Sequence, residues 1–130
     1  MTDRQPRVLV VDDELDFLDL FTKRFQKRGV EVFSRSNGPD ALRFLDENQV
    51  DVVVLDVRMP KMDGIEVLKE IKKRHPLVQV IMLTGHGSVN SGIQGMSHGA
   101  YDYVMKPFNL DDLMGRITQA VERKRLQEGR

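Results

Sequence analysis

Acidic, hydroxyl and ammonium side chains stand where the apolar runs of this sequence end. Asp12 and Asp13 follow the first run, Asp56 ends the third, Thr84 ends the fourth and Lys106 follows the fifth. Three carboxylates held close together repel one another unless a cation lies between them. Carboxylates suit a hard divalent ion, and Mg²⁺ typically uses one or two of them while keeping several waters. These residue types therefore indicate a magnesium site with a lysine beside it.

Such a site could support phosphoryl transfer. A divalent ion would bring the acidic cluster close to neutrality, and the carboxylate of Asp56 could then act as a nucleophile and form an acyl phosphate. Mg²⁺ and Lys106 would offset charge on the transferring oxygens. The hydroxyl of Thr84 could donate a hydrogen bond to the new phosphoryl group.

Each residue alone also has an ordinary structural interpretation. The acids at 12–14 would favour the positive end of a following helix. Thr84 could be a strand residue, and Lys106 could be a solvated lysine in a turn. Capping explains Asp56 poorly, because the next helix is expected to start only at Asp63. The functional interpretation rests on finding all of these side chains at one edge of a sheet.

The elements that must position these residues follow from hydrophobic periodicity. Apolar runs that predict strands cover residues 7–11, 30–34, 50–56, 78–84 and 100–105. Amphipathic stretches lie between the runs, and the last of them predicts a helix that ends near residue 124. Strands separated by helices predict an α/β fold, a doubly wound five-stranded parallel sheet of (βα)5 type. Ligands bind such sheets at the carboxyl ends of the strands, so the polar residues should meet there.

The stretch 88–98 is the weakest helical pattern. Gly92 and Gly95 lie inside it, and each costs about 1 kcal/mol relative to Ala. We therefore expect this helix to be the loosest element. Two interpretations stay open: the glycines serve a segment that moves, or they are tolerated in a poor surface helix.

Length and composition indicate one globular domain. Lys plus Arg and Asp plus Glu each number 20, so the net charge is zero and gives no general attraction to nucleic acid or to an anionic membrane. No apolar run reaches the length of a membrane span. The N-terminal residues lack an apolar signal region, which predicts a cytoplasmic location. There is no cysteine, which excludes disulfides and thiolate chemistry.

Four segments resemble a known family. VVDDE, VVLDVRMPKMDG, MLTGHGS and GAYDYVMKPF are similar to the signature segments of the receiver domain of bacterial two-component response regulators. The resemblance extends over roughly residues 7–122 and implies a flavodoxin-like strand order 2-1-3-4-5. It also implies a signalling switch that accepts a phosphoryl group from a sensor histidine kinase or a phosphotransfer protein. Such a receiver is not an enzyme acting on other substrates, but it catalyses its own Mg²⁺-dependent phosphorylation and dephosphorylation.

The resemblance implies roles for the residues of the acidic site. Asp56 matches the phosphoacceptor. Asp12 and Asp13 match the acidic pair that holds Mg²⁺ together with Asp56, and the backbone carbonyl of Arg58 matches a further ligand. We hypothesise that Arg58 and His86, which flank the acceptor, control the access of attacking water.

The resemblance also implies a set of switch residues. Thr84 and Lys106 match the hydroxyl and the lysine that contact the phosphoryl group. Tyr103 matches the aromatic residue that changes rotamer on activation, and Pro107 matches a proline whose peptide bond is often cis.

A receiver of this kind would act through protein partners. The segments 88–98 and 100–105 and the last helix would form the face that rearranges to control an output, and a homodimer through that face is possible. We expect a receiver domain at 1–124, with 125–130 as a frayed tail or the start of a linker. The domain would bind neither nucleic acid nor a membrane directly. It would be either a stand-alone receiver or a piece of a longer regulator.

Three other functions are alternatives to an active receiver. A magnesium-dependent phosphohydrolase with an aspartate nucleophile usually has a second acid two residues later, where this chain has Arg58. A nucleotide or flavin module should have a glycine-rich phosphate loop, but GHGSVN (85–90) places Asn90 where the third glycine is needed. A degenerate receiver that only binds partners should have lost part of its polar set. Here that set is intact.

Overall fold

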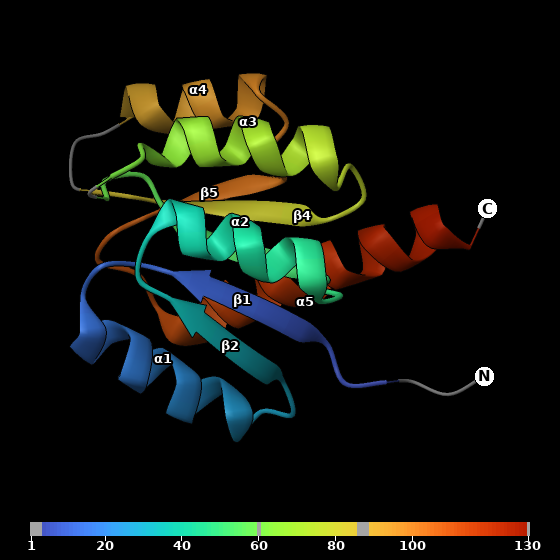
Figure 1. The fold of residues 1–130 in the computed structure, drawn as a ribbon. Coiled ribbons are helices and arrows are strands. Elements are labelled where there is room, and N and C mark those ends of the chain that lie inside the picture. Colours follow the sequence, from blue (N-terminus) through green and yellow to red (C-terminus); the bar gives the residue numbers. More distant parts are fainter. Residues whose placement is uncertain (1–3, 60, 86–88, 130) are drawn as a thin grey trace.

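The polypeptide folds as a parallel sheet with helices on both faces (Figure 1). A computed structural model describes residues 4–59, 61–85 and 89–129. In chain order the elements are β1 (Arg7–Val11), α1 (Leu15–Gln26), β2 (Glu31–Arg35), α2 (Gly38–Glu47), β3 (Val52–Asp56), α3 (Gly64–Arg74), β4 (Gln79–Thr84), α4 (Val89–Ser97), β5 (Asp102–Met105) and α5 (Leu110–Glu128). The sheet order is β2-β1-β3-β4-β5, which confirms the predicted fold class and strand order.

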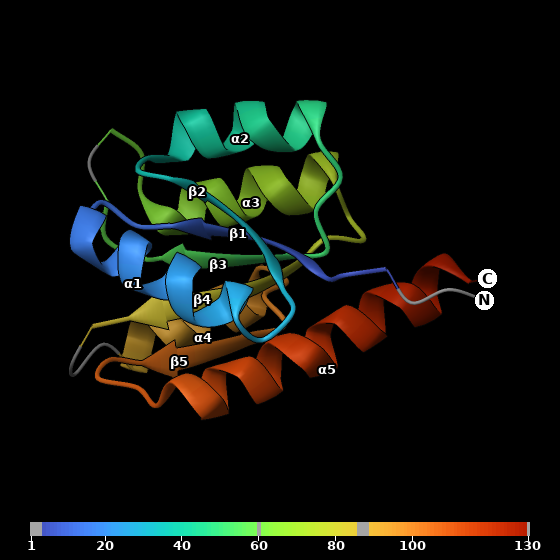
Figure 2. The ribbon, with the colours of Figure 1, turned by 90° about the horizontal axis from the view of Figure 1, so that it is seen from below.

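Alternate side chains of the central strands build two cores. Leu9, Val53 and Met82 face the side that carries α2, α3 and α4. Val8 and Val54 face α1 and α5, and Figure 2 shows α5 on the side of the sheet opposite α2 and α3. Every residue of β3 is buried, as the continuous apolar run predicted.

The strand β2 lies at the edge of the sheet. All its residues are only half-buried, and it begins and ends one residue later than predicted, at Glu31 and Arg35. Its register explains the shift, because Glu31 pairs with Arg7 and Arg35 pairs with Val11. The apolar Val30, which suggested a strand start, instead packs beside Phe25 and closes the end of α1.

Side-chain caps fix the starts of three helices. Asp63 accepts a hydrogen bond from the N–H of Ile65 (3.1 Å), which confirms the predicted start of α3. Asn109 accepts from the N–H groups of Asp111 and Asp112 at the start of α5. Asn37 caps α2, which begins at Gly38, by accepting a hydrogen bond from the N–H of Asp40 (3.0 Å).

The helix α5 is longer than predicted. It continues to Glu128, whereas the basic residues after 121 suggested a solvated helix end near residue 124. Lys124 is the reason, because its side chain is 8% exposed and its Nζ lies 3.3 Å from a carboxylate oxygen of Asp51. The ion pair of Lys124 with Asp51 connects this part of α5 to the end of the sheet. The expected division of the chain at residue 124 stays a prediction.

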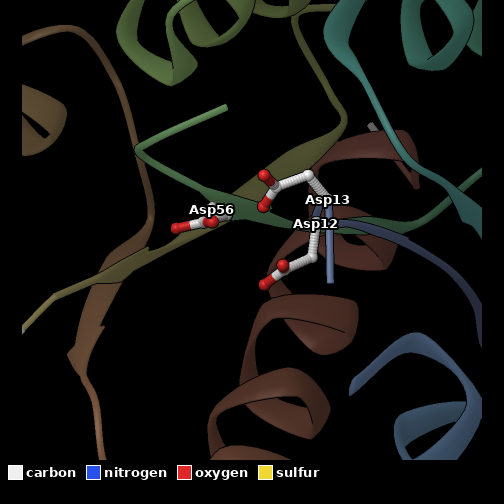
Figure 3. Close-up of side chains that lie close together, drawn as sticks. All are labelled: Asp12, Asp13 and Asp56. Carbon is white, nitrogen blue, oxygen red and sulfur yellow. The ribbon is translucent and has the colours of Figure 1, made fainter. Parts of the chain in front are cut away.

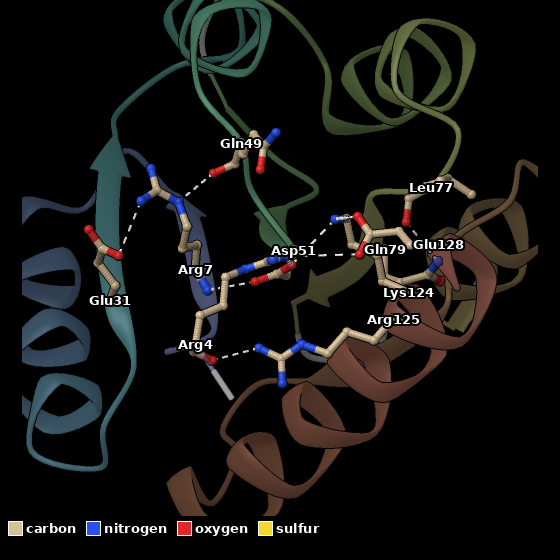
Figure 4. A network of polar contacts seen from close by, with 10 residues as sticks. All are labelled: Arg4, Arg7, Glu31, Gln49, Asp51, Leu77, Gln79, Lys124, Arg125 and Glu128. Atoms are coloured by element: carbon tan, nitrogen blue, oxygen red, sulfur yellow. Dashed lines mark hydrogen bonds and ion pairs between the residues drawn. The ribbon is translucent and has the colours of Figure 1, made fainter. Parts of the chain in front are cut away.

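Asp51 joins three parts of the chain at the sheet edge where β3 begins (Figure 4). Its carboxylate accepts a hydrogen bond from the backbone N–H of Arg7 (2.8 Å) and lies 3.4 Å from the guanidinium of Arg4. Lys124 reaches the same carboxylate from α5 and also pairs with Glu128. Because Asp51 directly precedes β3 and Asp56 ends it, this network lies at the end of the strand opposite the predicted phosphoacceptor.

Among the described residues, we find no helix with the length and apolar character needed to cross a lipid bilayer.

Candidate functional site

The three predicted acids meet at the carboxyl ends of β1 and β3. These strands are neighbours, with Val11 paired to Leu55, so the residues that follow them lie side by side. Each of Asp12, Asp13 and Asp56 offers a carboxylate oxygen, and these oxygens lie within 4.8 Å of one another (Figure 3). Asp12 and Asp56 are buried and Asp13 is exposed. This all-oxygen donor set, open on one side, fits a hard divalent cation.

Lys106 completes the cluster from the loop between β5 and α5. Its Nζ lies 3.2 Å from Oδ2 of Asp12 and 3.9 Å from Oδ1 of Asp56. The exposed Glu14, which sequence analysis connected only with the start of the following helix, lies 3.7 Å from the same ammonium. The peptide bond between Lys106 and Pro107 is cis. The lysine therefore stands where it can offset negative charge that gathers near Asp56.

Burial and like charges disturb the ionisation of the site. Burial raises the pKa of Asp56 to about 6, and the charge of Asp12 adds to that effect while Lys106 opposes it. Burial also raises the pKa of Asp12, although the N–H of Glu14 and the ammonium of Lys106 oppose the rise. Burial alone would lower the pKa of Lys106, but the charges of Asp56 and Asp12 outweigh it and the pKa is raised. A cation among these carboxylates would favour their charged forms.

Arg58 contributes its backbone to the site. It follows Asp56 by two residues, and its N–H lies 3.4 Å from Oδ1 of Asp56. Its side chain is exposed. His86, the other residue hypothesised to control access to the acceptor, lies outside the described residues.

Thr84 ends β4 beside the acceptor strand. Its neighbour Leu83 pairs with Asp56, so Thr84 lies next to the acidic cluster. The residue is fully buried. Among the described residues, its Oγ1 is the one buried side-chain nitrogen or oxygen atom that has no hydrogen-bond partner. An unpaired buried hydroxyl costs about 1–3 kcal/mol. Thr84 is therefore suited to donate to a group that arrives at this edge of the sheet.

The comparisons with known proteins agree with this geometry. The family described as the response regulator receiver domain matches residues 8–118. This chain belongs to that family. The resemblance inferred from the sequence segments is thereby confirmed for the greater part of the receiver domain.

Individual relatives show how much of a longer protein the receiver matches. It is 37% identical over 116 residues to the regulatory protein AtoC of Escherichia coli (strain K12), which covers 89% of this chain and 25% of that protein. It is 38% identical over 122 residues to a putative NtrX-like response regulator of Rickettsia conorii (strain ATCC VR-613 / Malish 7), covering 92% and 26% respectively. The chain thus spans about a quarter of the length of these curated relatives.

Solved receiver structures superpose closely. A response regulator receiver domain protein from Clostridium thermocellum is 40% identical, with a TM-score of 0.89, covering 94% of this chain and 98% of that one. The receiver domain of the Francisella response regulator 1452 is 34% identical, with a TM-score of 0.86, covering 92% and 98%. The fold of the receiver therefore rests on both sequence and structural similarity.

Tyr103 of the receiver packs closely against α4. It lies on β5 opposite Met82, and its half-buried ring contacts the core on that face. A Cβ added to Gly92 would lie 2.5 Å from Cδ2 of the Tyr103 ring, and one added to Gly95 would lie 3.0 Å from Cγ of Met82. Both glycines are buried. They allow α4 to pack closely against β5 at Tyr103 and against β4 at Met82, so tolerance at a solvated surface does not explain them.

Replacing Gly92 with Ala should therefore destabilise the receiver, whereas the same replacement at Gly115 should stabilise it. The new methyl group at 92 would overlap the ring of Tyr103, and such overpacking costs about 1–3 kcal/mol. A Cβ at the exposed Gly115 of α5 meets no atom within 4 Å, so alanine there should add about 0.5–1 kcal/mol through helix propensity. Urea unfolding of both variants measures the difference. Equal stabilities would contradict the close packing of Tyr103 on Gly92.

Proposed function

We propose that this receiver domain is a phosphorylation-controlled signalling switch whose acceptor is Asp56. Membership of the response regulator receiver family supports the signalling role. The single observation that carries the choice of acceptor is that Asp56 is buried at the centre of the cluster, with the carboxylates of Asp12 and Asp13 and the ammonium of Lys106 around it. The phosphoryl donor would be a sensor histidine kinase or a phosphotransfer protein.

The residues of the site would have different roles in phosphoryl transfer. Asp12, Asp13 and Asp56, with the backbone carbonyl of Arg58, would hold Mg²⁺, which would offset charge on the transferring oxygens. A carboxylate oxygen of Asp56 would attack phosphorus as the bond from phosphorus to the donor nitrogen breaks, and the donor imidazole would leave. Lys106 would lie against the phosphoryl oxygens and hold their charge. Water would later attack phosphorus as the bond from phosphorus to the Asp56 oxygen breaks, which releases inorganic phosphate and restores the carboxylate.

The phosphoryl group would change the packing behind the site. It adds negative charge and acceptor oxygens, and the unpaired hydroxyl of Thr84 would donate to one of them. Movement of Thr84 would alter the space next to Tyr103 and α4. The face formed by α4, β5 and α5 would then rearrange to control an output or a homodimer. We propose a cytoplasmic location for this switch, and no direct contact with nucleic acid.

The test is to incubate the receiver with Mg²⁺ and acetyl phosphate and to measure its intact mass. We expect a gain of one phosphoryl group, which is lost in Asp56→Asn and when the metal is chelated. Asp19→Asn, which removes an exposed carboxylate from α1, should be modified like the wild type. Modification that persists in Asp56→Asn would overturn the assignment of the acceptor.

A mixture that contains a generic phosphate ester in place of acetyl phosphate separates the receiver from a phosphohydrolase. A hydrolase would release many phosphates per protein from a generic phosphate ester in steady state. The receiver should stop near one per site unless a phosphodonor recharges it. Continuous turnover would therefore favour the hydrolase.

A further inference from the structure

An aromatic ring of α1 lies near the ammonium of Lys106. Phe17 is in the first turn of α1, three residues after Glu14, and the Nζ of Lys106 lies 5.5 Å from its ring centroid. This distance is within the range of about 6 Å in which a cation is attracted to the face of an aromatic ring. The Lys106 side chain is 27% exposed, so water only partly screens the attraction.

The ring of Phe17 is itself held in place from two directions. It packs edge-on against Phe108, at a centroid distance of 5.9 Å and an interplanar angle of 88°. Phe108 follows Lys106 by two residues, so the loop that carries the lysine also carries a support for the ring. The ring of Phe17 also packs against that of Phe21, which is fully buried in the core, at a centroid distance of 5.9 Å. These two aromatic contacts hold the ring of Phe17 in place, whereas the side chain of Lys106 is flexible.

Of the three acids near the ammonium of Lys106, Asp12 alone accepts a hydrogen bond from it. Asp12, Glu14 and Asp56 present oxygens at 3.2, 3.7 and 3.9 Å from Nζ, a spread of less than 1 Å. Glu14 is 71% exposed, so an ammonium drawn toward it would move toward solvent and away from Asp56. The ring of Phe17, 5.5 Å from Nζ, adds an attraction that favours the observed place of the ammonium.

We propose that Phe17 is a positioning residue that holds the ammonium of Lys106 between Asp12 and Asp56. The inference rests on the proposed function, since it assigns Lys106 to the phosphoryl oxygens. Phe17 touches neither acceptor nor phosphoryl group in this role, and it acts only through the lysine. Sequence patterns could not show this, because Phe17, Phe21 and Phe25 have the helical spacing of ordinary core residues.

The first test measures the rate of phosphorylation by acetyl phosphate with Mg²⁺ over a range of donor concentrations. Phe17→Leu keeps an apolar side chain but removes the ring, and we expect the maximal rate to fall about two- to fivefold, the worth of a partly exposed cation–π contact. The donor concentration at half-maximal rate should change little. Phe17→Tyr keeps the ring and should restore the rate. The matched control is Phe25→Leu in the same helix, distant from Lys106, which should leave the rate unchanged.

A double-mutant cycle separates positioning from general loss of structure. If Phe17 acts through the lysine, Phe17→Leu should have no further effect on the rate in a Lys106→Ala background. An equal slowing in both backgrounds, or an equal slowing in Phe25→Leu, would overturn the inference.

The second test does not depend on phosphorylation. The ring current of Phe17 should shift the NMR signals of the Lys106 ε-methylene protons, and the shift should vanish in Phe17→Leu and persist in Phe17→Tyr. If the wild type is not phosphorylated by the donor, the proposed function fails while this measurement still decides the placement of the lysine. Unchanged ε-methylene signals in Phe17→Leu would overturn the positioning role whatever the outcome for phosphorylation.

Discussion

Replacement of Asp56 by Asn should raise the free energy of unfolding of the metal-free receiver by about 3 kcal/mol at pH 8. Burial, with the charge of Asp12 as the next cause, raises the pKa of Asp56 from 3.8 to about 6. At pH 8 the native protein must therefore hold a carboxylate that its surroundings disfavour. The amide of asparagine has nearly the same shape and carries no charge, so the variant avoids that cost.

Because the pKa of Asp56 is higher in the native state than in the unfolded chain, the stability of the receiver depends on pH. In the unfolded chain Asp56 has its ordinary pKa of 3.8, so between that value and about 6 the native state binds more protons than the unfolded state. Stability of the wild type consequently falls as the pH rises through this window, and the loss is complete above it. Below the unfolded pKa both states are protonated, and the contribution of this group disappears. The advantage of Asp56→Asn should thus be small near pH 4 and constant above about pH 7.

Urea unfolding in the presence of a chelator, from pH 4 to pH 8, measures this difference. Asp19→Asn makes the same charge change at an exposed position and should alter stability by less than about 0.5 kcal/mol at every pH. Added Mg²⁺ should stabilise the wild type more than Asp56→Asn and so narrow the gap, because the ion binds the charged carboxylate. An advantage of Asp56→Asn that does not vary with pH would refute the raised pKa.

The meeting of the site residues could be predicted because the sheet is parallel. Strands that run in the same direction end at one edge, so Asp12, Asp56, Thr84 and Lys106 could be placed together from their positions after apolar runs. The completely apolar β3 made its central position predictable as well. The end of a strand and its burial on both faces can be predicted from the local sequence. Neither prediction requires knowing which side chains are in contact.

The predictions failed or stopped where a residue's role depends on a partner distant in the chain. Lys124 was taken for part of a solvated helix end, because nothing local shows that Asp51 lies beneath it. Gly92 had two open interpretations until the ring of Tyr103 was found against it. Phe17 had the spacing of a core residue, and only the fold brings Lys106 over its ring. In each case the two residues in contact lie on different segments of the chain. The pattern of hydrophobic residues does not determine how those segments align against each other.

Two replacements of Lys124, which pairs with the buried Asp51, should destabilise the receiver to different extents. Asp51 has a side chain that is 2% exposed, and breaking a buried pair by removing one partner costs about 3–5 kcal/mol because the remaining charge is uncompensated. The N–H of Arg7 also donates to Asp51, so we expect Lys124→Ala to lose about 3 kcal/mol, at the lower end of that range.

Lys124→Met should stay closer to the wild type than Lys124→Ala. Methionine keeps most of the buried stem and leaves no cavity, and Arg4 lies 3.4 Å from the carboxylate that the lysine would leave behind. Urea unfolding compares the two variants with Gln119→Ala, an exposed position of α5 that should be nearly neutral. Equal losses of stability in Lys124→Met and Lys124→Ala would show that the missing ammonium accounts for the whole effect and that the packing of the side-chain stem contributes nothing. Asp51 lies at the opposite end of β3 from Asp56. We therefore expect Lys124→Met to accept a phosphoryl group at the wild-type rate. The contact between α5 and the sheet can then be weakened without disturbing the acceptor.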